Sequence, residues 1–237
     1  MHGRSKCLRT MIPLTPTAQQ EHVLYTVHFR ALTEEYALAG EDIPDAIWRC
    51  KPPAVNVGMP LLRLIHGLPG SGKSELMKWL KQYFENVWLW KKNKQFALIA
   101  PMNMMVGNIG GTTIHSVGRI PFKGKRGNVV QSGKGAEPGG SIFTDEEYHE
   151  LRFVLMDEVE AAGVSLFGRL EDSLRLNVPR TSTLQAIQGK QHCDRRRQIA
   201  FAGVNVLCFG GFWQLDPTGI QPSCQIRRNT LATRAPT

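Results

Sequence analysis

The feature that most constrains this chain is the stretch GLPGSGKS, residues 67–74. Its spacing, G-x-x-x-x-G-K-S, is typical of a loop whose backbone N–H groups surround phosphates. In such a loop the lysine reaches the β- and γ-phosphates, and the last hydroxyl is placed to hold Mg²⁺. A helix that starts behind the loop adds the positive end of its dipole. The stretch therefore predicts a nucleoside triphosphate site, with a chance glycine-rich turn as the alternative.

The segments on both sides of this loop meet the requirement for a strand before it and a helix after it. LLRLIH (61–66) is an apolar run of strand length, and SELMKWLKQYF (74–84) has apolar residues at helical spacing. Further apolar runs of strand length are FALIAP (96–101), RFVLMDEV (152–159) and the start of VNVLCFGG (204–211). Strands that alternate with helices predict an α/β fold with a parallel sheet.

Composition narrows the class of protein further. The chain has 237 residues, 42% of them hydrophobic and 21% charged, which suits one globular domain with an appendage. No apolar run approaches the roughly 18 residues of a membrane helix, so no membrane partner is expected. Five scattered cysteines argue against a disulfide framework or a structural zinc site, and an intracellular setting is expected. The net charge of +9 suggests a polyanionic partner such as nucleic acid, or else a basic but unspecialised surface.

The chain divides into three predicted parts. Residues 1–60 form an N-terminal helical extension that ends in the connector KPPAVNVGMP, residues 61–220 form the nucleotide-binding lobe, and residues 221–237 form an unstructured tail. Two polar stretches within the lobe, 121–141 and 181–198, are interpreted as exposed loops. Their basic residues would contact phosphates or remain solvated.

A phosphate-binding loop needs an acid for its metal ion, and VLMDE (154–158) supplies a pair. Asp157 follows an apolar strand and is placed to hold Mg²⁺. Glu158 is placed to orient or deprotonate the attacking water. The pair favours hydrolysis over phosphoryl transfer to a small molecule. The alternative is that both acids cap the following helix.

Four segments in order resemble a known family. GLPGSGKS, NIGGTTIHS, LMDEVEAAG and NVLCFGGFWQLDP resemble the first RecA-like lobe of superfamily 1 DNA helicases, in particular the petite-integration-frequency (PIF) type related to RecD. The corresponding family patterns read approximately G-x-A-G-T-G-K-S, N-I-G-G-x-T-I-H-S, D-E-x-S-M and G-D-x-x-Q-L-P-P. The resemblance runs from about residue 16 to about residue 218. It implies a RecA-like P-loop NTPase with ATP and Mg²⁺ as cofactors and single-stranded DNA as partner. It also implies a role in DNA repair, recombination and telomere maintenance, in the nucleus or the mitochondrion.

The resemblance also implies roles for individual residues. Lys73, Glu158 and Gln214 would be catalytic, Gln214 as the sensor of the γ-phosphate, and Ser74 and Asp157 would hold the metal ion. Gln20 would read adenine, with Gln19 as its rival. The remaining implied contacts to nucleotide are those of Gly67, Leu68, Pro69, Gly70, Ser71, Gly72, Lys73 and Ser74, and those to DNA are those of Thr113, His115, Lys123, Lys125 and Arg126. For His115 the alternative is a helix-start histidine packed on the core.

The chain departs from the family patterns at several positions. The acid of G-D-x-x-Q is replaced by Gly211, and Glu160 stands where the D-E-x-S pattern has serine. Met102 and Asn103 replace residues that would lie along the DNA. We also expect the second lobe, whose arginines stabilise charge on the transferred phosphate, to be missing from this chain. Two hypotheses follow: the ATPase lobe of a 5′-to-3′ DNA helicase, or a non-catalytic remnant, from a mobile element or a truncated helicase, that binds ATP and DNA. An unrelated P-loop kinase or motor would not explain TTIHS or FWQLDP.

Overall fold

The computed structural model describes residues 15–53, 55–120, 122–123, 129–130, 150–178 and 200–211. Its centre is a five-stranded sheet in the order β1-β7-β6-β2-β3, in which every neighbouring pair is parallel. The strands are β1 (Leu62–His66), β2 (Phe96–Ala100), β3 (Thr112–Thr113), β6 (Phe153–Met156) and β7 (Asn205–Gly210). A separate antiparallel pair joins β4 (Phe122–Lys123) to β5 (Val129–Val130). The predicted α/β fold with a RecA-like parallel sheet is confirmed.

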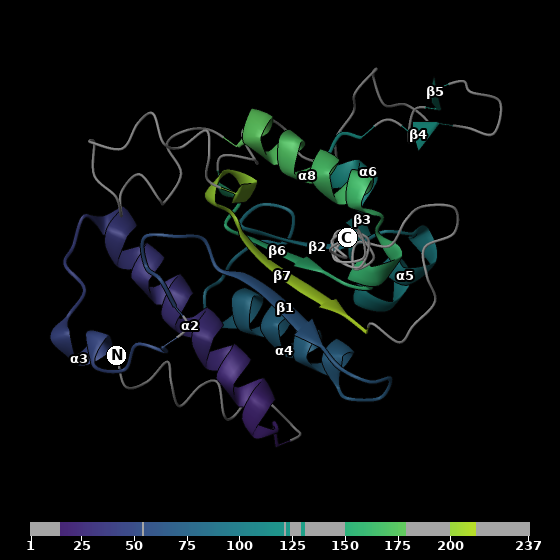
Figure 1. Ribbon diagram of the computed structural model, residues 1–237. Coiled ribbons are helices and arrows are strands. Elements are labelled where there is room, and N and C mark those ends of the chain that lie inside the picture. The colour runs from purple at the N-terminus through teal and green to yellow at the C-terminus, as the bar shows by residue number, and fades with distance from the viewer. Residues whose placement is uncertain are drawn as a thin grey trace, which may run out of the picture.

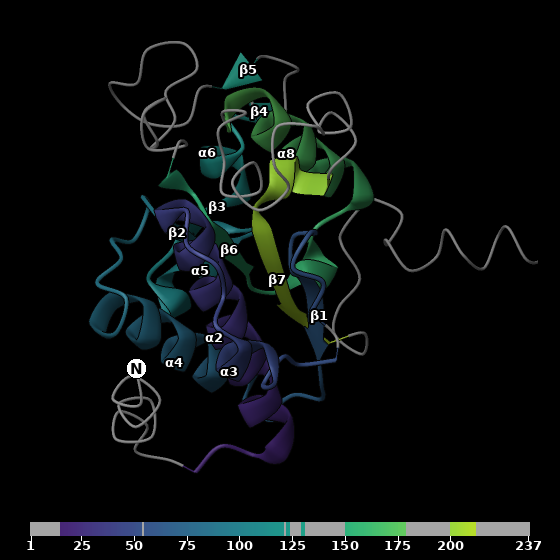
Figure 2. The same cartoon turned by 90° about the vertical axis from the view of Figure 1, so that its left-hand side faces the viewer.

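Helices cover both faces of the sheet (Figures 1 and 2). One face packs against α2 (Ala18–Ala39) and α4 (Lys73–Asn86), and the other packs against α6 (Ile114–Val117) and α8 (Val164–Asn177). The remaining helical segments are α3 (Asp45–Trp48), α5 (Asn103–Ile109) and the short 3-10 helices η1 (Val159–Ala161) and η4 (Ala200–Gly203). Within the described ranges, no helix is both long and apolar enough to span a membrane.

Residues along the central strands alternate between two hydrophobic clusters. In β2, Phe96 and Leu98 face the cluster under α2 and α4, whereas Ala97 and Ile99 face the cluster under α6 and α8. The strands β2, β6 and β7 are buried along their whole length because helices lie on both sides. This explains why the three segments read as continuous apolar runs in the sequence.

The helix α2 belongs to the same core as the sheet. Leu24, Val27 and Ala31 are buried beside Leu80 of α4 and Leu207 of β7. A reciprocal pair of hydrogen bonds between Thr17 and Gln20 caps its N-terminus. The predicted boundary at residue 60 therefore marks a connector between elements that share one core. The predicted tail, residues 221–237, lies outside the described residues.

A buried polar network ties α2 to the start of the sheet. The side-chain oxygen of Asn205 accepts hydrogen bonds from the Leu61 amide at 2.8 Å and from Arg30 Nε at 3.0 Å. Its amide nitrogen donates to Glu34 Oε1 at 2.7 Å and to the Arg152 carbonyl at 3.0 Å. Arg30 and Glu34 are themselves paired at 2.8 Å with side chains 0% and 2% exposed. One asparagine therefore satisfies polar groups from three other segments of the chain.

Replacing Asn205 by Ala should lower the free energy of unfolding by about 2 kcal/mol, because buried donors and acceptors lose their partner. The measurement is urea denaturation followed by circular dichroism. Asn86→Ala, at the exposed end of α4, is the matched control and should change stability little. Equal unfolding midpoints for Asn205→Ala and the parent would contradict the importance of this network.

Candidate functional site

The predicted phosphate loop connects β1 to α4, as the sequence indicated. Its two tight positions are Gly70 and Gly72, whose φ angles are +78° and +82°. Backbone in this left-handed region favours glycine because a Cβ would be strained. A Cβ at Gly67 would lie 2.5 Å from Ser71 Oγ, so a larger residue there would displace the Ser71 side chain. The backbone geometry therefore explains the glycines at positions 70 and 72 of the motif.

The lysine of the motif, Lys73, holds its charge inside the loop. Its ammonium group donates hydrogen bonds to the carbonyls of Gly67 at 2.8 Å and Leu68 at 3.1 Å. Its positive charge also acts on the two acids of the segment VLMDE (154–158): it lowers the pKa of both Asp157 and Glu158. The loop and the acidic segment thus lie close enough to form one site.

The strand order explains this proximity. The phosphate loop follows β1 and Asp157 directly follows β6, with β7 between the two strands. Because all the strands are parallel, their carboxyl ends meet at one edge of the sheet, where α/β proteins bind their ligands. The Gly67 amide donates to the carbonyl of Gly210 at the end of β7, at 3.2 Å. The end of β7 is therefore in direct contact with the start of the phosphate loop.

Asp157 is a buried carboxylate, 7% exposed, at this edge. Burial raises its pKa above the usual value, although a hydrogen bond and the charge of Lys73 oppose the shift. That hydrogen bond runs from the Glu158 amide to Asp157 Oδ1 at 3.1 Å. Glu158 itself has φ +51° and ψ +48°, an uncommon conformation for a residue other than glycine. Its side chain makes no capping hydrogen bond to η1.

Burial is the main cause that raises the pKa of Glu158 to about 7. A hydrogen bond with the side chain of Glu160 and the negative charges of Glu160 and Asp157 raise it further, while Lys73 opposes them. A carboxyl group with a pKa near neutrality can accept a proton from water more readily than an ordinary glutamate. This is the property that a water-activating base requires.

The residues at this edge suit a magnesium nucleotide. The Ser74 hydroxyl and the Asp157 carboxylate are oxygen ligands of the kind that Mg²⁺ prefers. Within the part of the chain that the structure describes, no group of three or more acidic, histidine or cysteine residues could hold a metal ion alone. Mg²⁺ usually takes one or two protein carboxylates together with phosphate oxygens, so a site completed by the nucleotide fits these residues.

Gln20 is placed against the phosphate loop by the capped start of α2. Its side-chain nitrogen donates to the Gly72 carbonyl at 3.3 Å, and its side-chain oxygen accepts from the Thr17 amide at 2.9 Å. Gln19, its rival in the sequence, is exposed. The structure thus brings Gln20 to the site, while its reading of adenine stays a prediction.

The residues predicted to bind DNA are only partly described. Thr113 ends β3 and caps α6, where its hydroxyl accepts a hydrogen bond from the Ser116 amide at 3.2 Å. His115 is half-buried, and burial together with the charge of Arg169 lowers its pKa. Lys123 lies in β4, and its side chain is not described. Lys125 and Arg126, like the predicted sensor Gln214, lie outside the described residues.

Glu160 is a site residue that the motif reasoning did not select. It lies in η1, and its Oε1 accepts a hydrogen bond from the Gly211 amide at 3.0 Å. Its side chain also shares a hydrogen bond with Glu158. The signal that could have indicated it was the acid three residues after Asp157, at a position where the resembled family has serine.

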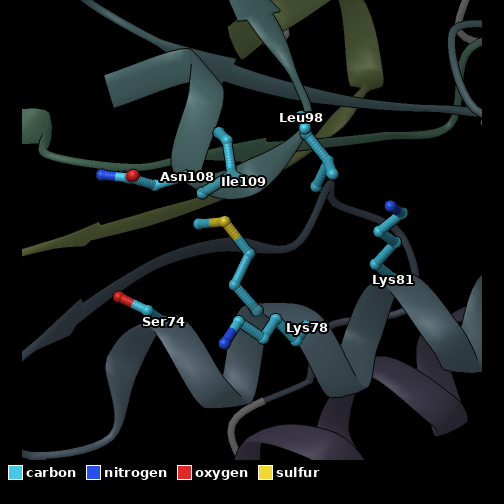
Figure 3. A pocket seen from close by; sticks show the side chains of 8 residues that line it. Ser74, Lys78, Lys81, Leu98, Asn108 and Ile109 are labelled. Carbon is cyan, nitrogen blue, oxygen red and sulfur yellow. The ribbon is translucent and has the colours of Figure 1, made fainter. Parts of the chain in front are cut away.

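A pocket of about 250 Å³ lies beside the phosphate loop, between α4 and α5 (Figure 3). Its apolar part is formed by Met77, Leu98 and Ile109, and Lys78 and Lys81 also line it. Ser74 is the one lining residue that belongs to the phosphate loop. Neither acid of the LMDE segment lines this pocket, so it is a neighbour of the predicted nucleotide site rather than the site itself.

No protein-family model matches the chain, and no curated protein matches it. In structure, the chain resembles Pif1 helicases. An unliganded Pif1 from Bacteroides sp. is 16% identical, with a TM-score of 0.48 over 91% of this chain and 36% of that one. Pif1 helicase from Candida albicans is 18% identical, with a TM-score of 0.42 over 86% of this chain and 34% of that one. A Bacteroides Pif1 in complex with ADP-AlF3 and ssDNA is 21% identical, with a TM-score of 0.43 over 73% of this chain and 33% of that one.

These solved helicases are of the type that the motifs resemble. The chain spans about a third of their length. At these identities and TM-scores the likeness concerns the fold alone, so any argument about function rests on the residues of this chain.

Proposed function

We propose that this chain is the ATPase lobe of a 5′-to-3′ DNA helicase, which hydrolyses ATP with Mg²⁺ and contacts single-stranded DNA. One observation carries the proposal: the phosphate loop and the acidic pair Asp157–Glu158 meet at one edge of the sheet, with Lys73 acting on both acids. A lone glycine-rich turn would not require buried acids at the end of a strand close by. The pairing is what nucleotide hydrolysis needs.

Each residue of the site then has a defined task. The loop amides and Lys73 bind the phosphates, which places their negative charge near the start of α4. Ser74 and Asp157 would hold Mg²⁺, and the ion would supply positive charge beside the phosphate oxygens. Glu158 accepts a proton from the attacking water, a role that its raised pKa supports. Gln20 keeps the loop against α2 through the carbonyl of Gly72.

The proposed DNA contact lies at the same edge of the sheet. Thr113 ends β3 and His115 follows it, while the nucleotide residues follow β1 and β6. Burial and the charge of Arg169 lower the pKa of His115, which favours contact with DNA by hydrogen bonding over contact by charge. Contacts between basic side chains of the protein and DNA phosphates would add affinity for DNA, and this part of the affinity would fall as the salt concentration rises.

The proposal is tested by ATP turnover of the 237-residue chain with and without oligo(dT). We expect the oligonucleotide to raise turnover about tenfold, which corresponds to about 1.4 kcal/mol less activation free energy. A blunt duplex of equal length is the control and should stimulate less. MgATP binding without turnover would instead favour the non-catalytic remnant, and turnover that ignores DNA would remove DNA from the proposal. The polarity of movement stays a prediction.

A further inference from the structure

The peptide group between Gly210 and Gly211 joins two parts of the candidate site. Its N–H donates to Glu160 Oε1 at 3.0 Å, and its carbonyl accepts from the Gly67 amide at 3.2 Å. Since a peptide group is planar, fixing the direction of its N–H also fixes the direction of its carbonyl. Glu160 therefore acts, through one rigid unit, on the first residue of the phosphate loop.

The space around Gly210 shows that this contact is tightly packed. A Cβ at Gly210 would collide with Glu160 Oε2 and would lie 2.9 Å from Val159 Cγ1. Gly210 and Gly211 are both buried, so their polar groups cannot turn to water for a partner. The glycine at the end of β7 is thus needed for the Glu160 side chain to lie over the strand.

Glu160 also acts on the other half of the site, because its carboxylate can accept a hydrogen bond from protonated Glu158 and its negative charge raises the pKa of Glu158. Glu160 and Gly211 are both positions at which the chain departs from the family patterns. In the structure the Glu160 carboxylate accepts a hydrogen bond from the Gly211 amide. One side chain therefore acts on the proposed water-activating residue and, through the Gly210–Gly211 peptide, on the phosphate loop.

We propose that Glu160 is a positioning residue that holds the Gly210–Gly211 peptide and thereby fixes Gly67, the first residue of the phosphate loop, against the end of β7. The identity of the ligand, a nucleoside triphosphate, rests on the proposed function. The hydrogen bonds of the Gly210–Gly211 peptide do not depend on it. A carboxylate strengthens the hydrogen bond that it accepts, and chains of hydrogen bonds polarise one another. Glu160 then acts on the nucleotide through the backbone, without touching it.

Three variants separate this role from a purely structural one. Glu160→Ala removes the acceptor and should weaken MgATP binding roughly tenfold, the range seen for outer-shell partners of ion sites. Glu160→Gln keeps an oxygen for the Gly211 amide and should bind within about twofold of the parent. Glu171→Ala, on the surface of α8, is the control and should bind as the parent does. The measurement is titration with a fluorescent ATP analogue and Mg²⁺, after thermal unfolding has shown that each variant is folded.

A double-mutant cycle tests the contact itself. Gly210→Ala should weaken binding in the parent because its Cβ displaces Glu160, and it should add little in the Glu160→Ala background. Additive effects of the two changes would overturn the inference. So would an equal loss of binding in Glu160→Gln and Glu160→Ala, since that result would assign the effect to charge rather than to the hydrogen bond.

Amide hydrogen exchange gives a readout that needs no nucleotide. We expect Glu160→Ala to speed exchange at Gly211 and Gly67 by about tenfold, while Glu160→Gln leaves both rates close to the parent's. Unchanged exchange at both amides in Glu160→Ala would overturn the inference. If the parent chain fails to bind MgATP, the proposed function fails, and the exchange rates still decide whether Glu160 positions the loop.

Discussion

Replacing Lys73 by Ala should weaken MgATP binding by roughly 100-fold or more. The ammonium group provides the one positive side chain within the loop, and each charge-assisted hydrogen bond to phosphate is worth about 1.5–3 kcal/mol. The change also removes the charge that opposes the raised pKa values of Asp157 and Glu158. The measurement is isothermal titration calorimetry with MgATP.

Lys78→Ala is the matched control for this prediction. Lys78 lies on the same helix, is exposed, and pairs with Glu75 at 3.5 Å outside the loop. Its replacement should change the MgATP dissociation constant by no more than about twofold, because exposed ion pairs contribute little. Equal binding by the Lys73 variant and the parent would show that the glycine-rich loop is not a phosphate site.

Replacing Glu158 by Gln should reduce ATP hydrolysis by about 10²–10⁴-fold while MgATP stays bound. Glutamine has the same shape, so the left-handed backbone at this position and the contact to Glu160 can persist, but it cannot accept the proton of the attacking water. The measurement is single-turnover hydrolysis of radiolabelled ATP with oligo(dT) present, together with retention of ATP on the protein. The account predicts a variant that traps ATP.

Glu171→Gln provides the same chemical change away from the site, on the surface of α8, and should leave turnover unchanged. Undiminished hydrolysis in the Glu158 variant would assign water activation to another group. Absence of hydrolysis in both the parent and the variant would favour the non-catalytic remnant.

The elements nearest the loop could be predicted because their local patterns are strong. The helical pattern at 74–84 corresponds to the helix Lys73–Asn86, since its apolar residues follow the helical period and its start is fixed by the glycines. The strand that carries Asp157 was predicted because it is buried on both faces and therefore reads as a continuous apolar run. In both cases the pattern of apolar residues within the segment itself is enough to predict the helix or strand.

Other elements depend on contacts between distant segments and gave no local signal. The helix α5 was not predicted, since Gly107 lies within it and Met104, 88% exposed, breaks the apolar period. The strand β3 has only two residues and is defined by pairing with β2. The position of β7 between β1 and β6 follows from packing of the whole sheet.

The candidate site divides in the same way. The phosphate loop and the acidic pair were found from spacing alone, because their chemistry needs fixed residue types at fixed distances along the chain. The contact between Gln20 and Gly72 spans 52 residues, and that between Glu160 and Gly211 spans 51. Contacts of this range become visible only when α2 and η1 are packed against the sheet.

We propose that the phosphate loop and the Asp157–Glu158 segment form one nucleotide site. The most direct test is amide hydrogen exchange of the 237-residue chain with and without a non-hydrolysable ATP analogue and Mg²⁺. The account predicts slower exchange in two separate peptides, one covering residues 67–74 and one covering residues 153–160, and no change within α8 at residues 164–177. Exchange that is unchanged at residues 67–74, or slowed there without any effect at residues 153–160, would contradict it.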